Sequence, residues 1–204
     1  SWTPRWASPN YDQEVMVTAT ILTDVEIAKV VLSYRLDSTW NNLTMIKSGN
    51  VWTKNIPRHK YATTIHYKVY ATDICGTCVV STTSTYMVGD ATKPKILDPS
   101  RSPKEPTEKE SVTVSAQITE PQNASGLDEE KIWLVYKVGG NQYWVRMAKD
   151  PISGNYTGTI PQQSGGANVS FHIEASDKAT PSNTARGPSK PSDDPKYTVL
   201  FLPV

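Results

Sequence analysis

The strongest constraint on the fold of this 204-residue chain is that its sequence repeats itself. Four segments in the first half match four in the second half, in the same order: 14–24 with 111–121, 30–38 with 132–140, 49–57 with 152–161, and 65–73 with 169–177. The offset between matched residues rises only from 97 to 104 along the chain. Collinear matches at nearly constant spacing indicate a duplicated structural unit. The sequence therefore predicts two copies of one domain.

Within each repeated segment, apolar and polar residues alternate with a period of two, as in strands with one buried face. The residues predicted to face inward in the first copy have apolar counterparts in the second: Val15, Val17, Ala19 and Ile21 match Val112, Val114, Ala116 and Ile118, and Ile65, Tyr67, Val69 and Ala71 match Val169, Phe171, Ile173 and Ala175. No segment keeps a 3.6-residue period, and fifteen prolines interrupt the chain. We expect an all-β chain in which each copy forms two packed antiparallel sheets.

The order of these motifs resembles the immunoglobulin-like and fibronectin III-like repeats of archaeal and bacterial surface proteins and secreted enzymes. The resemblance covers nearly all of both halves and rests on four patterns: V-x-L-x-Y at 30–34, S-V-T-V-x-A-x-I at 111–118, Y-x-G-x-I-P at 156–161 and V-x-F-x-I-E-A-x-D at 169–177. It implies two tandem antiparallel β-sandwiches, at 1–90 and 95–204, with a short linker at 91–94. The two cysteines do not occupy the positions of the inter-sheet disulfide of antibody domains, so the resemblance is to the wider class of sandwiches.

The second copy is longer than the first in two places, which correspond to the B–C and F–G loops of such a sandwich. These insertions lie at 121–130 and 178–196. We expect both enlarged loops at the end of the second sandwich that receives the linker, where they would brace the junction. The alternative is that they are solvated loops, which vary freely in length.

Cys75 and Cys78 flank a Gly-Thr pair between the sixth and seventh predicted strands. A catalytic dithiol is expected at the start of a helix, whereas residues 79–88 alternate as a strand. A zinc site would need two further ligands, and no two of the three histidines share a repeat position. We therefore expect a disulfide between Cys75 and Cys78 across a two-residue turn, with inert free thiols as the alternative.

Four Asn-x-Ser/Thr triplets are candidates for N-glycosylation, and they begin at Asn42, Asn123, Asn155 and Asn168. The strand phases and the insertion place all four toward solvent, although chance triplets are the alternative in a chain rich in Ser and Thr. Together with the expected disulfide, they favour an extracellular or cell-surface location. The net charge of +1 predicts no nucleic-acid partner, and no apolar run approaches the roughly 20 residues needed for membrane insertion.

No catalytic signature is found: there is no Gly-x-Ser-x-Gly elbow, no phosphate-binding glycine loop and no His-Glu-x-x-His motif. The acidic run at 128–130 lacks the spacing of a calcium loop. Asp73 and Asp177 occupy matching positions after the sixth strand, where we expect them to hydrogen-bond the backbone of a turn. We thus expect no catalytic residue, cofactor or metal.

Trp133, Trp144 and His172 alternate with inward-facing residues and should share the outer face of one sheet in the second sandwich. Exposed flat aromatics can stack on sugar rings or contact another protein, or they can lie under the stems of long side chains.

The sequence predicts a non-enzymatic extracellular structural or adhesion module: a stalk, surface-layer or spacer segment of a larger surface protein. Its partners would be neighbouring domains or other surface proteins. The alternative function is that of accessory polysaccharide-binding or spacer domains in a secreted hydrolase.

Overall fold

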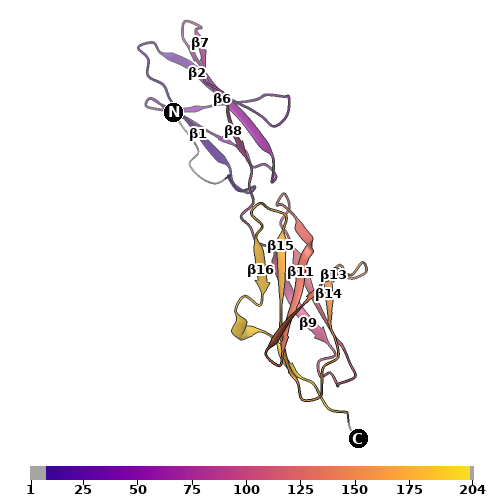
Figure 1. Cartoon of the computed structure of the whole chain (residues 1–204). Helices are drawn as coiled ribbons and strands as arrows, with labels where there is room; N and C mark the ends of the chain where they lie inside the picture. Colours follow the sequence, from indigo (N-terminus) through magenta and orange to yellow (C-terminus); the bar gives the residue numbers. More distant parts are fainter. Residues whose placement is uncertain (1–7, 203–204) are drawn as a thin grey trace. The chain divides into compact units, whose positions relative to one another are not determined.

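A computed structural model describes residues 8–202 of the chain (Figure 1). These residues form antiparallel strands, with one three-residue 3-10 helix, η1 (Pro191–Asp193). The chain divides after Asp90 into two compact units, here domain 1 and domain 2, and residues 91–94 belong to domain 2. The prediction of an all-β chain of two antiparallel sandwiches is confirmed.

Domain 1 consists of two sheets. The smaller sheet has the order β1–β5–β4, from β1 (Val15–Thr20), β4 (Ile46–Ser48) and β5 (Val51–Ile56). The larger sheet has the order β3–β2–β6–β7, with β8 also paired to β6; it contains β2 (Ile27–Arg35), β3 (Asn41–Thr44), β6 (Thr64–Asp73), β7 (Cys78–Val80) and β8 (Ser84–Met87).

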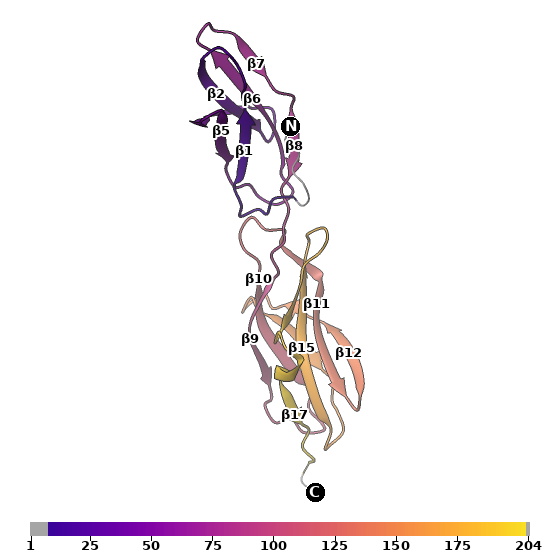
Figure 2. The ribbon, with the colours of Figure 1, turned by 90° about the vertical axis from the view of Figure 1, so that its left-hand side faces the viewer.

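Domain 2 repeats this plan and adds a strand at one edge. Its first sheet has the order β9–β10–β14–β13, from β9 (Lys95–Ser102), β10 (Val112–Thr119), β13 (Ala148–Lys149) and β14 (Tyr156–Ile160). Its second sheet has the order β12–β11–β15–β16, with β17 also paired to β15; it contains β11 (Leu127–Val138), β12 (Asn141–Arg146), β15 (Asn168–Asp177), β16 (Thr184–Gly187) and β17 (Lys196–Thr198). Figure 2 shows β9 lying beside β10.

The strand registers demonstrate the duplication independently of the sequence match. Val15 pairs with Ile56 in domain 1, and their counterparts Val112 and Ile160 pair in domain 2. Likewise Leu32 faces Val69 across β2 and β6, and Leu134 faces Ile173 across β11 and β15. The matched sequence segments are therefore equivalent strands.

The predicted alternation describes the core of domain 2 closely. In β10, Val112, Val114, Ala116 and Ile118 are buried and the residues between them are not. Burying one aliphatic side chain of this size contributes about 1.5–3 kcal/mol, so the inward row holds this sheet against the other. In domain 1 the equivalent Ala19 and Ile21 are only half-buried, and the core is less complete along that edge.

The longer of the two insertions does not lie where we expected it. In both domains the last strand is split, and residues 188–195 separate β16 from β17 where only residues 81–83 separate β7 from β8. Assigning all of the insertion to the F–G loop was therefore wrong. Pro188, Pro191 and Pro195 explain the break, because proline has no N–H to donate to a sheet.

The turn that contains the cysteines also differs from the prediction. The N–H of Asp73 donates to the carbonyl of Thr77 at 3.0 Å, so the turn has three residues and ends with Gly76 at φ 87°. Cys75 lies within this turn, and Cys78 pairs with the residue before Asp73. The predicted pairing of Cys75 opposite Cys78 was wrong, and both thiols are free and exposed.

Candidate functional site

The outer face of the β12–β11–β15–β16 sheet gathers the aromatic residues singled out in domain 2. Trp133 lies opposite Arg146 on β12 and Glu174 on β15. Two residues further along β11, Val135 lies opposite Trp144 and His172. All these side chains therefore share one face, which we call the domain 2 face.

Only part of this face is open to solvent. The side chain of Trp144 is 56% exposed and Trp133 is half-buried, whereas His172 is 6% exposed. The expectation of a continuous exposed patch that includes His172 was wrong. Trp144 is the residue of the three that is available to a ligand.

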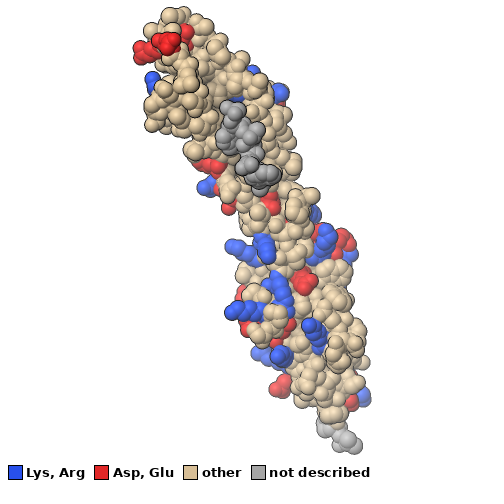
Figure 3. Space-filling model, turned by 60° about the vertical axis from the view of Figure 1, so that its left-hand side comes forward, with Lys and Arg blue, Asp and Glu red and all other residues tan. Residues whose placement is uncertain are grey.

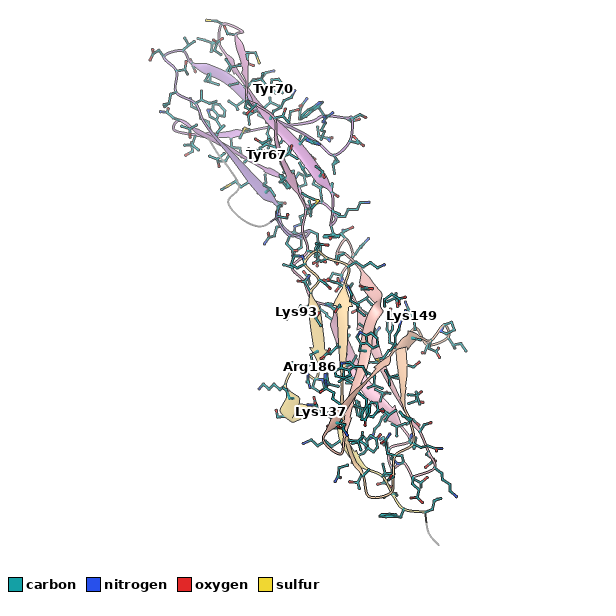
Figure 4. The ribbon with its side chains drawn as sticks, viewed as in Figure 1. Tyr67, Tyr70, Lys93, Lys137, Lys149 and Arg186 are labelled. Atoms are coloured by element: carbon teal, nitrogen blue, oxygen red, sulfur yellow. The ribbon has the colours of Figure 1, made fainter. Side chains whose placement is uncertain are left out.

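His172 is buried because the insertion folds back over its own sheet. We call residues 188–195 the strap. Asp194 of the strap places a carboxylate oxygen 3.7 Å from Nδ1 of His172 and accepts two hydrogen bonds of 2.8 Å from Arg186 on β16. Glu174 lies 3.0 Å from the other ring nitrogen of His172. Figure 4 shows Arg186 beside η1.

This arrangement fastens the strap to the domain 2 face. One guanidinium nitrogen of Arg186, Nη2, donates to both oxygens of Asp194, and Nη1 donates to the carbonyl of Pro188, so the arginine bonds the strap at two residues. Both members of the Arg186–Asp194 pair are shielded from solvent here, since the Asp194 side chain is 9% exposed. The buried histidine thus serves a structural contact.

The acidic residues at 128–130 form contacts within domain 2. Asp128 forms an ion pair of 2.9 Å with Lys131, and this hydrogen bond lowers the pKa of its carboxyl. Glu129 accepts a 2.7 Å hydrogen bond from the hydroxyl of Tyr156, and Glu130 pairs with Arg146. Each of the three carboxylates therefore has a protein partner.

The matched aspartates hold turns, as predicted. Asp73 accepts hydrogen bonds from the N–H groups of Cys75 at 2.9 Å and Thr77 at 2.8 Å. Asp177 is fully buried and accepts from the N–H of Asn183 at 2.8 Å and from its side-chain amide at 2.7 Å. The expectation that both carboxylates bond the turn after the sixth strand is confirmed.

The four glycosylation candidates do not have the same exposure. Asn42, Asn123 and Asn168 are exposed, and Asn155 is half-buried. Asn123 adopts the left-handed conformation, at φ 71°, within the loop before β11. Asn168 accepts a 2.8 Å hydrogen bond from Thr198 through Oδ1, which leaves Nδ2, the atom that would carry a glycan, outside this contact.

Domain 1 carries an aromatic cluster that the sequence patterns did not indicate. Trp40 lies in the loop before β3, with the guanidinium of Arg35 5.0 Å and the ammonium of Lys68 4.5 Å from the centre of its ring. Lys68 also lies 5.1 Å from the ring of Tyr70. Cation–π contacts of this kind contribute about 0.5–1 kcal/mol at exposed sites. Trp40 has no counterpart in the second repeat, which is why the duplication did not reveal it.

Each domain has a parallel contact between the segment that precedes β1 or its counterpart β10 and the residues that follow the last strand, β8 or β17; in domain 2 this segment comes after β9. In domain 1, Tyr11 N–H donates to Gly89 at 3.0 Å, and Gly89 N–H donates to Pro9 at 2.8 Å. In domain 2, Glu108 N–H donates to Leu200 at 3.1 Å, and Leu200 N–H donates back to the chain at Pro106 at 2.8 Å.

The chain shows little sequence similarity to known proteins. No protein family matches the sequence, and no curated protein does. Solved structures similar to the chain include the following two. Fibronectin(III)-like modules of Clostridium thermocellum CbhA match at 14% identity and a TM-score of 0.33, covering 97% of this chain and 92% of theirs. The FN1–FN3 domains of chicken CNTN1 match at 13% identity and a TM-score of 0.32, covering 88% of this chain and 64% of theirs.

The structural neighbours are fibronectin III-like modules. Within residues 8–202, no helix is long and apolar enough to cross a membrane.

Proposed function

We propose that this chain is a non-catalytic, extracellular module that bears tension as a stalk or spacer segment of a larger surface protein. Its partners in this role are the neighbouring domains of the same polypeptide and other surface proteins. The observation that carries the proposal is the parallel contact, in each domain, between the segment before β1 or β10 and the residues after the last strand.

The direction of these contacts matters under load. When a domain is pulled by its two ends, two parallel segments at those ends are drawn in opposite directions along their own length. Their hydrogen bonds are then loaded together rather than opened one after another. Domain 1 places two backbone hydrogen bonds in this arrangement, and the two equivalent bonds of domain 2 receive the load through β9, which pairs with β10 ahead of them.

Other features support a structural role. The most buried carboxylate, Asp177, bonds its own turn, and the Arg186–Asp194 pair fastens the strap. Glycans at Asn42 and Asn123, both exposed, would suit a module exposed outside the cell.

The experiment is to stretch the full chain between two handles in optical tweezers. We expect two separate unfolding events. Domain 2 has more residues than domain 1, and at about 3.6 Å per residue their unfolding should lengthen the chain by about 40 and 30 nm. Extension without resolved events, at forces close to thermal noise, would contradict a tension-bearing role.

A second function is favoured by one observation, the exposure of Trp144 on the domain 2 face. In this reading the chain is an accessory polysaccharide-binding unit of a secreted hydrolase. Retardation in gels that contain polysaccharide would test it. Trp144→Ala should abolish the retardation, and Ile152→Ala, at a side chain that is 95% exposed elsewhere on domain 2, should not.

A further inference from the structure

Two cations lie beside one aromatic ring on the outer face of the larger sheet of domain 1. The registers place Arg35 of β2 opposite His66 of β6. Lys68 lies two residues further along β6, opposite Ser33, so the two cations are diagonal neighbours on one face. Their charged groups lie 5.0 and 4.5 Å from the centre of the Trp40 ring. We call Arg35, Lys68 and Trp40 the cationic site.

The two cations have no carboxylate partner among residues 8–202. No ion pair of this part of the chain involves Arg35 or Lys68, although both residues are half-buried. The Nε atom of Arg35 is buried and makes no hydrogen bond. Asp37, in the loop before Trp40, accepts a hydrogen bond from the N–H of Thr39 at 2.9 Å. Neighbouring like charges repel one another, and an anion bound beside both would relieve that repulsion.

A dense acidic group of domain 1 lies at the far end of the same sheet. Ile27 pairs with Asp73 at one end of the β2–β6 ladder, and Arg35 pairs with His66 at the other. Residues 24–26, which include two further carboxylates, lead into β2 at the first end. Figure 3 shows acidic side chains gathered at that end of domain 1. The cationic site therefore lies away from this acidic group.

Domain 2 shows where a carboxylate binds on the equivalent face. The registers make Lys68 equivalent to His172, and Tyr70 equivalent to Glu174. In domain 2 the strap brings a carboxylate oxygen of Asp194 to 3.7 Å from Nδ1 of His172. Glu174 supplies a second carboxylate, 3.0 Å from the other ring nitrogen. The chain itself thus provides the anions on this face of domain 2.

Domain 1 lacks both of these carboxylates. Only residues 81–83 separate β7 from β8, so there is no strap to reach across the sheet. Tyr70 stands where domain 2 has Glu174, and its ring lies 5.1 Å from the ammonium of Lys68. Residues 1–7 contain no acidic side chain and cannot supply one. The place that Asp194 occupies in domain 2 is therefore left to an anion from outside the chain.

We propose that the cationic site of domain 1 binds an acidic polysaccharide through its carboxylate or sulfate groups. The guanidinium of Arg35 can donate two parallel hydrogen bonds to such a group, and the ammonium of Lys68 adds a compact charge beside it. The site is separate from Trp144 of domain 2 and from the parallel contacts. Its failure would therefore leave both functions proposed above untouched.

The surroundings of the cationic site suit a sugar better than an acidic protein segment. Asn42 of β3 and Ser33 of β2 share one row of the sheet with Lys68. Asn42 and Thr44 are exposed, and their amide and hydroxyl groups can hydrogen-bond the hydroxyls of a sugar. The buried centre of a protein interface is mostly apolar and poor in charge, whereas the centre of this site carries two cations.

The experiment measures fluorescence anisotropy of labelled dextran sulfate with the full 204-residue chain, produced without N-glycans because Asn42 borders the site. A salt concentration of about 0.1 M limits long-range attraction to about 10 Å. Dextran sulfate should bind, and labelled neutral dextran should not. Unlabelled polygalacturonate, whose charges are carboxylates on sugar rings, should compete. Polyglutamate has carboxylates without sugars and should compete at least about fivefold more weakly.

Three variants of the chain locate the site. Lys68→Gln should weaken binding of dextran sulfate about tenfold, because a hydrogen bond to a charged group is lost. Lys47→Gln is the matched control, since Lys47 also lies over a tryptophan ring, 5.6 Å from Trp52 in the other sheet, and it should leave binding unchanged. Tyr70→Glu supplies the carboxylate that Glu174 provides in domain 2 and should also weaken binding. Circular dichroism verifies that all three variants are folded.

Three outcomes would overturn the proposal. Equal effects of Lys68→Gln and Lys47→Gln would show that net charge alone attracts the polysaccharide. Competition by polyglutamate as strong as that by polygalacturonate would assign the site to an acidic protein segment. Binding of dextran sulfate that Tyr70→Glu leaves unchanged would place the ligand elsewhere on the chain.

Discussion

Removing one hydrogen bond from the parallel contact of domain 2 should weaken that domain against force. The bond chosen is Glu108 N–H to the carbonyl of Leu200, at 3.1 Å. Glu108 is the second residue of a turn that is closed by Glu110 N–H donating to Thr107, a position where proline is favoured. Glu108→Pro therefore deletes the N–H with little disturbance of the turn, and Glu108→Ala retains it.

The expected magnitude follows from the surroundings of the bond. A backbone hydrogen bond contributes about 1 kcal/mol net. Leu200 is 45% exposed, so water can satisfy its carbonyl and the cost should stay near that value. A change of about 1 kcal/mol in the unfolding barrier alters a rate about fivefold.

The assay is the lifetime of folded domain 2 under constant force, recognised by its longer release of chain. We expect Glu108→Pro to shorten this lifetime about fivefold relative to Glu108→Ala. Domain 1 is the internal control, and its lifetime should not change. Equal lifetimes of domain 2 in the two variants would refute the inference that the parallel contact bears load.

Three further predictions concern stability. Asp177→Ala should destabilise its domain by about 2–4 kcal/mol, and Asp73→Ala by about 1, in urea unfolding, because Asp177 is itself fully buried and its loss leaves the buried N–H of Ala179 unpaired; similar losses would contradict this. Burial raises the pKa of Tyr197 to about 12. The hydroxyl of Tyr197 therefore loses its proton at lower pH in the unfolded chain than in the folded one, and the free energy of unfolding should fall as pH rises from 10 toward 12. Tyr197→Phe should reduce this dependence on pH, and an unchanged dependence would exclude Tyr197 as its source. Arg186→Met should release the strap, measured as faster proteolysis within residues 188–195, and unchanged cleavage would show that the Arg186–Asp194 pair does not hold it.

The fold could be predicted far more completely than the surfaces. Alternation within a strand states which side chains share a face, and the repeat then orders the strands because equivalent segments must pair in equivalent ways. Val112 and Ile160 illustrate this, since both were apolar at matched positions and both are buried in one register. Trp133 and Trp144 lie on the outer face for the same reason.

Alternation within a strand could not predict the burial of His172. Alternation placed it outward, but the strap, more than fifteen residues further along the chain, covers it through Asp194. The prediction for the cysteine turn was wrong for a more local reason. Asp73 pairs with Thr77, so the turn has one residue more than predicted and Cys75 does not lie opposite Cys78.

Local pattern thus sufficed for the class of fold and the inward rows, because both depend on side chains a few residues apart, and the repeat of that pattern at offsets of 97 to 104 residues sufficed for the number of domains. Long-range packing decided which outer face is covered, how the last strand is divided and which sheet gains the additional strand β9. Ile21 and Ile118 demonstrate the limit: their sequences around them are alike, yet one borders a hollow and the other is closed over by Ile96. That difference arises because the strand that covers the edge of β10 is a separate segment, β9. The residues of β10 alone do not predict that such a segment is present.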